Sequence, residues 1–334
     1  MYRLTATYKI ELPNQFRVKR SKDDPLRYTA VIEEFDVEVV LVCNGGTSFK
    51  ANGDLHETRT VTRIDVSISS DEDSTPPEVP TLEKGGRDFK DRASWFGKRA
   101  DEYSRIAIEA ANRVIRFFKY EMRTPRLREF SKVNSDFSNP LWTNRNGKEL
   151  ETGRIEFVVT VLSPPGPGLL GEKDFTEAED VKLRSALQSN LDIEMNMDFL
   201  SDAQTSVING KLRRAILEMA IACEVAVKGV FFSKSTTAGA VYEYLEDNRQ
   251  VHVRVIDLIN GAAKVAFGQS FKDLDPDAYK NIDFLFRARN KVAHRGERIY
   301  RDDGGTEYHV DRPTLEAWWE SVDKLMNWID QHRI

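Results

Sequence analysis

The hydrophobic pattern of this 334-residue chain changes its period once, at a segment rich in proline and glycine. Before the segment, apolar and polar residues alternate along several runs, the pattern of β-strands with one buried face. After it, apolar residues recur at helical spacing as far as the last residues. The segment itself, SPPGPGLLGE at 163–172, has the composition of a linker. We therefore expect an α+β chain with a β-rich domain at 1–162, a linker at 163–172 and an all-α domain at 173–334.

The expected β-rich domain contains strand-like runs and one long helical run. Apolar residues alternate with polar ones at 2–11, and the run at 27–43 is rich in β-branched residues. The Asn-Gly-Gly sequence at 44–46 predicts a turn after the second run. Further strands are expected at 58–69 and 154–162, and a helix at 93–122. These runs predict an antiparallel sheet with one face covered by the long helix.

The expected all-α domain consists of helical runs interrupted by one short hairpin. The helices are expected at 175–190, 202–232, 238–248, 251–267, 276–295 and 311–332. The hairpin is expected at 297–310, because an Asp-Asp-Gly-Gly sequence separates two short strand-like runs there. A helical bundle closed by the tryptophan-rich last helix is the predicted architecture.

The charge balance and the cysteine content exclude several classes of protein. The chain has 49 basic and 54 acidic residues and a net charge of −5, so contact with a nucleic acid requires a local basic patch. Cys43 and Cys223 are too far apart in sequence for a CxxC metal pair, and two cysteines make no disulfide framework. No run reaches the ~20 apolar residues of a membrane span, and the first residues alternate where a secretory signal would be continuously apolar. We expect a cytoplasmic protein without membrane contact.

The sequence RNKVAHRGE, at the end of the helical run 276–295, concentrates the residues that can carry chemistry. With ~100° of rotation per residue, Arg289 is expected at the centre of the apolar stripe, where a guanidinium needs a carboxylate or an anionic ligand. Asn290 and His294 are four residues apart and are expected to share a neighbouring face. Gly296 is expected to end the helix.

This sequence resembles the R-x(4–6)-H motif of the HEPN superfamily, in the form in which an asparagine follows the arginine. The resemblance covers the chain from about residue 172 onward, and residues 1–162 show no comparable resemblance. It implies an α-helical bundle with a metal-independent endoribonuclease site that uses no cofactor. It also implies a homodimer in which two motifs form a composite active site. A role as a bacterial defence protein or toxin is common among such nucleases and is implied in the same way.

The three motif residues fit the chemistry of RNA cleavage without a metal. Such cleavage needs a group that moves protons between the attacking 2′-hydroxyl and the leaving 5′-oxygen, and a fixed positive charge beside the phosphate. His294 fits the first role, because imidazole is the side chain that ordinarily changes charge nearest to neutral pH. Arg289 fits the second role. Asn290 is expected to bond the phosphate or to orient the imidazole.

Two carboxylates of the helical run 202–232 are expected to support the motif. This run is apolar nearly all round after residue 215, so Glu218 and Glu224 should be partly enclosed and one of them should pair with Arg289. Glu224 is the preferred partner. The alternative, in which both carboxylates face solvent or Lys228, stays open.

A basic segment surrounds the motif. Between residues 284 and 301 there are six basic residues against one acidic residue, Glu297. The five cations expected to bind RNA phosphates are Arg287, Lys291, Arg295, Arg298 and Arg301. The hairpin adds Tyr300, Tyr308 and His309, which either stack on bases or pack the hairpin onto the bundle.

A second interpretation gives these residues no catalytic role. His294 then acts at the helix C-terminus, where an imidazole is favourable against the helix dipole, and Arg289 packs against a core carboxylate. On this interpretation the helical domain is a dimerisation module or a module that binds nucleotide or RNA. On either interpretation the β-rich domain is expected to sense a signal or recruit a target, through a protein or ligand trigger that the residues do not identify.

Overall fold

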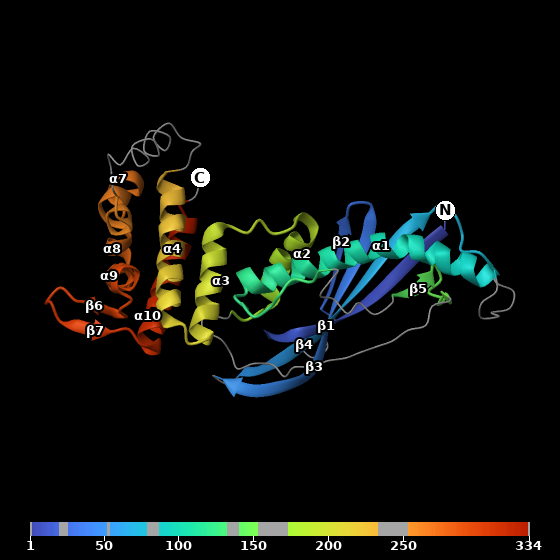
Figure 1. The fold of residues 1–334 in the computed structure, drawn as a ribbon, viewed down its shortest axis with the longest axis horizontal. Helices are drawn as coiled ribbons and strands as arrows, with labels where there is room; N and C mark the ends of the chain where they lie inside the picture. Colours follow the sequence, from blue (N-terminus) through green and yellow to red (C-terminus); the bar gives the residue numbers. More distant parts are fainter. Residues whose placement is uncertain are drawn as a thin grey trace. The chain divides into compact units, whose positions relative to one another are not determined.

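A computed structural model of the chain shows two compact units, the sheet unit up to Asp192 and the helical unit from Ile193 onward (Figure 1). The structure describes residues 2–19, 26–51, 54–78, 87–131, 140–152, 173–232 and 253–332. The strand expected at 154–162, the linker expected at 163–172 and the helix expected at 238–248 lie outside these residues. The antiparallel sheet followed by a helical region confirms the expected α+β organisation.

The strands that the structure describes in the sheet unit form one antiparallel sheet of five, in the order β2-β3-β4-β1-β5. The elements of this unit are β1 (Tyr2–Lys19), β2 (Arg27–Ile32), β3 (Phe35–Ala51), β4 (Asp54–Glu72), α1 (Arg87–Arg116), η1 (Phe117–Glu121), β5 (Leu141–Asn144), η2 (Glu177–Glu179) and α2 (Asp180–Ser189). The two short segments η1 and η2 are a π-helix that continues α1 and a 3₁₀ helix that precedes α2.

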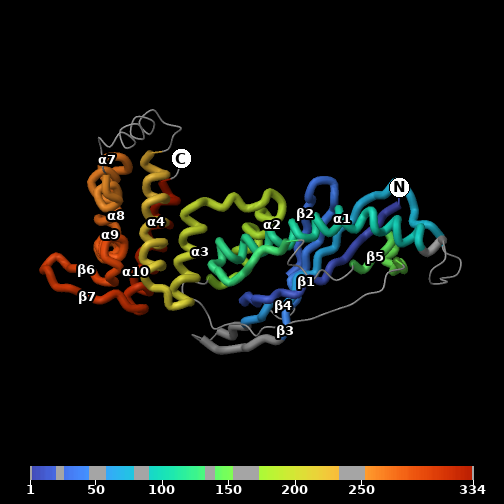
Figure 2. The backbone as a smooth tube through the Cα atoms, viewed as in Figure 1, coloured from blue at the N-terminus to red at the C-terminus, as the bar shows by residue number. Residues whose placement is uncertain are grey.

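The two faces of the sheet differ as the alternation in the sequence predicts. Leu4, Ala6 and Tyr8 of β1 are buried, whereas Thr5 on the other face bonds Ser69 of β4 through their hydroxyl groups at 2.8 Å. Helix α1 runs along the buried face, as the backbone trace in Figure 2 shows, and its apolar side chains share one core with the strands. The expectation of a long helix that covers a sheet is therefore confirmed.

Three details of the strands differ from the expectations. A turn at 33–34 divides the expected strand 27–43 into β2 and β3, and Glu33 adopts a φ of 55° there. The Asn-Gly-Gly sequence at 44–46 is not a turn, because β3 continues through it with a shift of register against β4. Strand β5 was not expected at all.

The sheet unit extends beyond the expected linker. We expected the second domain to begin at residue 173, but the compact units divide between Asp192 and Ile193. Phe175 is fully buried against Phe118, with ring centroids 4.9 Å apart, and Leu183 and Leu187 of α2 belong to the same core. Helical periodicity alone assigned this segment to the helical domain, whereas its apolar face packs on the sheet unit.

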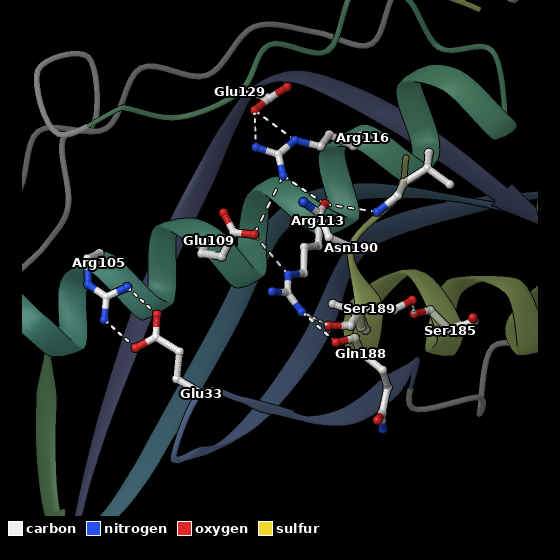
Figure 3. A network of polar contacts seen from close by, with 12 residues as sticks. Glu33, Arg105, Glu109, Arg113, Arg116, Glu129, Ser185, Gln188, Ser189 and Asn190 are labelled. Atoms are coloured by element: carbon white, nitrogen blue, oxygen red, sulfur yellow. Dashed lines mark hydrogen bonds and ion pairs between the residues drawn. The ribbon is translucent and has the colours of Figure 1, made fainter. Parts of the chain in front are cut away.

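Ion pairs and hydrogen bonds made by Arg113 and Arg116 of α1 stabilise the packing of α2 against α1. Arg113 bonds Glu109 and also donates to the backbone carbonyl oxygens of Leu187 and Gln188, at 2.6 and 2.9 Å (Figure 3). These carbonyls lie at the C-terminus of α2, where no intrahelical partner is available for them. Arg116 bonds Glu129 at 2.7 Å and the side-chain oxygen of Asn190 at 2.9 Å. We call Glu109, Arg113, Arg116 and Glu129 the α1–α2 network.

The helical unit is built from short and long helices with one small hairpin. Its elements are α3 (Met195–Ile208), α4 (Leu212–Phe231), α6 (Val255–Asp257), η3 (Leu258–Ala262), α7 (Ala263–Phe267), α8 (Phe271–Leu274), α9 (Pro276–Arg295), β6 (Ile299–Arg301), β7 (Glu307–His309) and α10 (Arg312–Asp330). The expected helix 202–232 is two helices, α3 and α4, because Gly210 takes a φ of 69° between them. The expectation for 276–295 matches α9 residue for residue.

Helices α4, α9 and α10 enclose the core of the helical unit. Trp318 and Trp319 of α10 are each 1% exposed, and Ala215, Met219 and Cys223 of α4 are fully buried. The short antiparallel hairpin β6–β7 connects α9 to α10, as expected for 297–310, and Figure 1 shows it as an arm that extends past the helices of this unit. Among the described helices, none is long and apolar enough to cross a membrane.

Candidate functional site

Helix α9 presents the motif residues in its last two turns. Asp275 caps its N-terminus by accepting a hydrogen bond from the backbone N–H of Ala278 at 2.9 Å, and Pro276 occupies the first turn. Gly296 ends the helix with a φ of 68°, and its N–H donates to the carbonyl of Val292 at 2.9 Å. The expected helix stop is confirmed, and it places His294 in the final turn.

Arg289 lies at the edge of the apolar stripe and not at its centre. The buried residues of α9 near the motif are Leu285, Ala288 and Val292, so Ala288 occupies the position that we expected for Arg289. The side chain of Arg289 is 36% exposed. The expected stripe consisted of Ile282, Leu285, Phe286, Val292 and Ala293. Its centre was displaced by one residue because Ala293 is exposed in the structure.

Arg289 reaches Glu224 across the α4–α9 contact. One guanidinium nitrogen lies 3.8 Å from Oε2 of Glu224, and another donates to Oδ1 of Asn290 at 3.2 Å. The other carboxylate oxygen of Glu224 lies 3.1 Å from Nζ of Lys228, one turn further along α4. Glu224 is therefore shared between two cations: it has the preferred contact with Arg289 and also the contact with Lys228 that the alternative named for both carboxylates.

Glu218 does not join this cluster. Its buried carboxylate accepts a hydrogen bond from the hydroxyl of Ser206 at 2.7 Å and one from Nε of Arg214 at 2.5 Å. These partners belong to α3 and α4. The geometry makes Glu218 a part of the α3–α4 packing, which corrects the expectation that it supports the motif.

His294 and Asn290 are both exposed. Within the described part of the chain, the imidazole of His294 has no hydrogen bond and no ion pair. The side-chain oxygen of Asn290 is engaged by Arg289, which leaves its amide N–H groups available to an acceptor. The last two turns of α9 thus carry the imidazole of His294, the amide donors of Asn290 and the guanidinium of Arg289.

The five cations around the motif fall into two groups. Arg287 bonds Asp283 at 2.5 Å and Asp303 at 2.7 Å, and Arg301 bonds Glu307 at 3.2 Å. Burial lowers the pKa of Arg287, but its two carboxylate partners more than offset this and raise the pKa overall. Lys291, Arg295 and Arg298, by contrast, have no carboxylate partner among the residues that the structure describes. We call these three residues the unpaired cations.

Sequence reasoning did not predict how the hairpin aromatics are arranged. The ring of Tyr300 lies between Phe284 of α9, at a centroid distance of 4.7 Å, and Tyr308, at 5.3 Å. Burial raises the pKa of Tyr300, and the nearby Tyr308 and Asp302 act in the same direction. Tyr308 is 44% exposed, and its hydroxyl donates to Asp302 at 3.2 Å. His309 is also exposed, as the last residue of β7.

Side chains that could ligate a metal do not gather in the described residues, where no group of three or more His, Cys, Asp or Glu is suitably placed.

Comparisons of the chain with models of known protein families, with curated proteins and with solved structures find no match. What the site does must therefore be argued from its own geometry.

Proposed function

We propose that the helical unit is a metal-independent endoribonuclease of HEPN type, with His294, Arg289 and Asn290 as its catalytic residues. The observation that carries the proposal is the exposed imidazole of His294 beside the unpaired cations, none of which is engaged by a carboxylate of the described residues. At this helix end the imidazole can transfer protons and the cations can bind a phosphate, and cleavage of a phosphodiester requires both. The motif resemblance points to the same chemistry.

The proposed reaction begins with attack of the 2′-oxygen of RNA on the adjacent phosphorus. An imidazole accepts the 2′-hydroxyl proton as the new P–O bond forms, and a proton is delivered to the 5′-oxygen as the old P–O bond breaks. Arg289 stabilises the extra negative charge on the phosphate oxygens, while Asn290 donates an N–H to one of them. The products are a 2′,3′-cyclic phosphate end and a free 5′-hydroxyl end.

A homodimer with a composite site completes this mechanism. The attacking and leaving oxygens lie on opposite sides of the phosphorus in an in-line displacement, so one imidazole is poorly placed to serve both. Two copies of the chain would supply two imidazoles, one for each oxygen. The sheet unit is proposed to sense a trigger or to recruit the target. The assignment to bacterial defence or to a toxin rests on the resemblance.

RNA cleavage by the full-length chain in excess EDTA tests the mechanism. We expect wild-type protein to cleave single-stranded RNA under these conditions and to leave 2′,3′-cyclic phosphate or 3′-phosphate ends. His294→Ala should abolish cleavage while changing the free energy of unfolding by less than about 0.5 kcal/mol, because the side chain is exposed. Loss of cleavage in EDTA that Mg²⁺ restores would contradict the mechanism.

The second candidate function is a module that binds RNA without cleaving it. The contact between Arg289 and Glu224 favours this function. The nearby carboxylate partly neutralises the guanidinium charge, so Arg289 stabilises a negatively charged transition state less strongly. Wild-type protein that binds RNA but never cleaves it, or cleavage that survives His294→Ala, would select this function.

A further inference from the structure

Four side chains of the helical unit form one continuous stack that ends in an open aromatic ring. The guanidinium of Arg287 lies 5.6 Å from the ring centroid of Phe284, whose ring is followed by those of Tyr300 and Tyr308. The last two rings are nearly parallel, with an interplanar angle of 19°. Tyr308 is 44% exposed, and Tyr300 is its only ring contact among the described residues. We therefore take the ring face that points away from Tyr300 to be the accessible one.

The stack is held rigidly enough to act as a platform. Trp318 of α10 meets Tyr300 edge-on at a centroid distance of 5.4 Å, and Arg287 ties α9 to the hairpin through the backbone carbonyl of Arg301 at 3.0 Å. The Tyr308 hydroxyl is bonded to Asp302, which limits rotation of the ring. A planar ligand on the open face of Tyr308 would therefore meet a surface that is already ordered.

Charge around the open ring is compatible with an anionic ligand. The hairpin carries Asp302, Asp303 and Glu307, which are engaged respectively by the Tyr308 hydroxyl, by Arg287 and by Arg301. Arg298 belongs to the unpaired cations, and its backbone carbonyl accepts the N–H of Val310 at the base of the same hairpin. Two of these three carboxylates are thus ion-paired, whereas the hydroxyl bond leaves the charge of Asp302 in place. Arg298, which has no carboxylate partner among the described residues, supplies positive charge at the base of the hairpin.

The distance from the stack to the motif suits a single strand of nucleic acid. Phe284, at the α9 end of the stack, precedes His294 by ten residues, which corresponds to about 15 Å along the helix axis. Tyr308 lies two ring separations, of 4.7 and 5.3 Å, beyond Phe284. A few nucleotides span such a distance. Bases of a single strand can leave their neighbours and stack on an aromatic side chain, whereas bases in a duplex stay stacked on one another.

We propose that the open face of Tyr308 is a base-stacking site for single-stranded RNA, located a few nucleotides from the phosphate that occupies the motif. This site rests on the proposed function for the identity of the nucleic acid and specifies its substrate as unpaired RNA. Tyr308 supplies affinity for a base without reading its identity, because every base has a flat face.

Binding of fluorescent RNA to the full-length His294→Ala chain tests the site without cleavage. The probes are a single-stranded oligonucleotide, an abasic oligonucleotide of the same length and a duplex. Replacement of Tyr308 by leucine, which keeps apolar bulk and removes the flat ring, should weaken binding of the single strand about tenfold. Binding of the abasic strand and of the duplex should change less than twofold. Tyr308→Phe keeps the ring and loses only the bond to Asp302, so it should retain most of the affinity for the single strand.

The outcomes separate the stacking site from the nuclease. Equal affinity of the Tyr308→Leu and unsubstituted chains for the single strand overturns the stacking site and leaves the nuclease intact. Wild-type protein that binds single-stranded RNA through Tyr308 but does not cleave it overturns the nuclease and supports the stacking site. A loss of binding by Tyr308→Leu that Tyr308→Phe shares, or a change of oligomeric state in both variants, overturns the stacking site in favour of a packing or subunit contact.

Discussion

The arginines of α1 and the cations at the end of α9 have opposite surroundings. In the sheet unit, Arg113 and Arg116 are fully engaged by carboxylates, backbone carbonyls and Asn190 (Figure 3). In the helical unit, the unpaired cations have no carboxylate partner among the described residues. A cation that is already neutralised holds the fold together, whereas one that is not is available to a ligand.

This difference changes how the basic segment of the sequence should be interpreted. Counting charges from 284 to 301 gives five expected phosphate contacts, but two of those cations, Arg287 and Arg301, resemble the α1 arginines in being paired. The remaining three mark the surface that an RNA backbone can use. Substitution of a paired arginine of α1 should therefore change stability, whereas substitution of an unpaired cation should change RNA binding.

The largest expected effect is on cleavage and follows from Arg289. Arg289→Ala should lower the cleavage rate by about 10²–10³, the usual cost of removing one preorganised charge donor from a transition state. The free energy of unfolding should fall only slightly, because Glu224 is 33% exposed and keeps Lys228 as a partner. Single-turnover cleavage and thermal unfolding measure the two effects. Arg289→Lys is the matched control, because lysine keeps the positive charge but lacks the planar guanidinium. It should cleave faster than Arg289→Ala and more slowly than the wild type.

The next largest effect is on stability and follows from the α1–α2 network. Arg113→Ala should lower the free energy of unfolding of the sheet unit by about 1.5–3 kcal/mol, because it removes charged hydrogen bonds from two carbonyls at the end of α2. Denaturant unfolding measures the change, and RNA cleavage should be unaffected. Arg105→Ala provides the control, since the one ion pair of Arg105 within the described residues is with exposed Glu33, and its loss should matter less. Equal losses from both variants would contradict the structural role of the network.

The smallest effect is on the salt dependence of RNA binding. Lys291→Ala and Arg295→Ala should each reduce the slope of log affinity against log salt concentration by roughly 0.7, the loss of one phosphate contact on a single strand. Arg301→Ala removes a cation that is paired with Glu307, and it should leave the slope unchanged. Titration of a labelled single strand at several salt concentrations makes the comparison. A slope that responds equally to all three substitutions would show that pairing does not decide which cations bind RNA.

Much of the fold was predictable because its signals are local in sequence. The two-residue alternation of β1 and the caps of α9, with Asp275 before Pro276 and Gly296 after Arg295, are read directly from neighbouring residues. The turn at Glu33 was missed because glutamate rarely adopts a positive φ, so nothing in the composition marks it. The break at Gly210 was missed because the apolar periodicity is similar on both sides of it.

Apart from the pairing of Arg289 with Glu224, the site was predictable only where its residues share one helix. Arg289, Asn290 and His294 all belong to α9, and their spacing alone placed them on adjoining faces. The pairing of Arg287 with Asp303 depends on how the hairpin folds back on α9, and the bond from Arg113 to Leu187 joins residues that are 74 apart in sequence. No local pattern indicates such contacts. Tyr308 was singled out, but its place at the end of a stack requires the three-dimensional structure.

The position of β1 inside the sheet has a consequence for how the chain folds during synthesis. Although β1 is made first, it lies between β4 and β5, and Leu4 pairs with Asn144. The edge of β1 from Leu4 to Thr7 therefore stays unpaired until β5 is made, and the core is completed later still, by Phe175 and Leu187. Pairings so distant in sequence are slow to form, and an unpaired strand edge invites association with other chains. The nascent sheet unit should thus need protection on the ribosome until α2 has emerged.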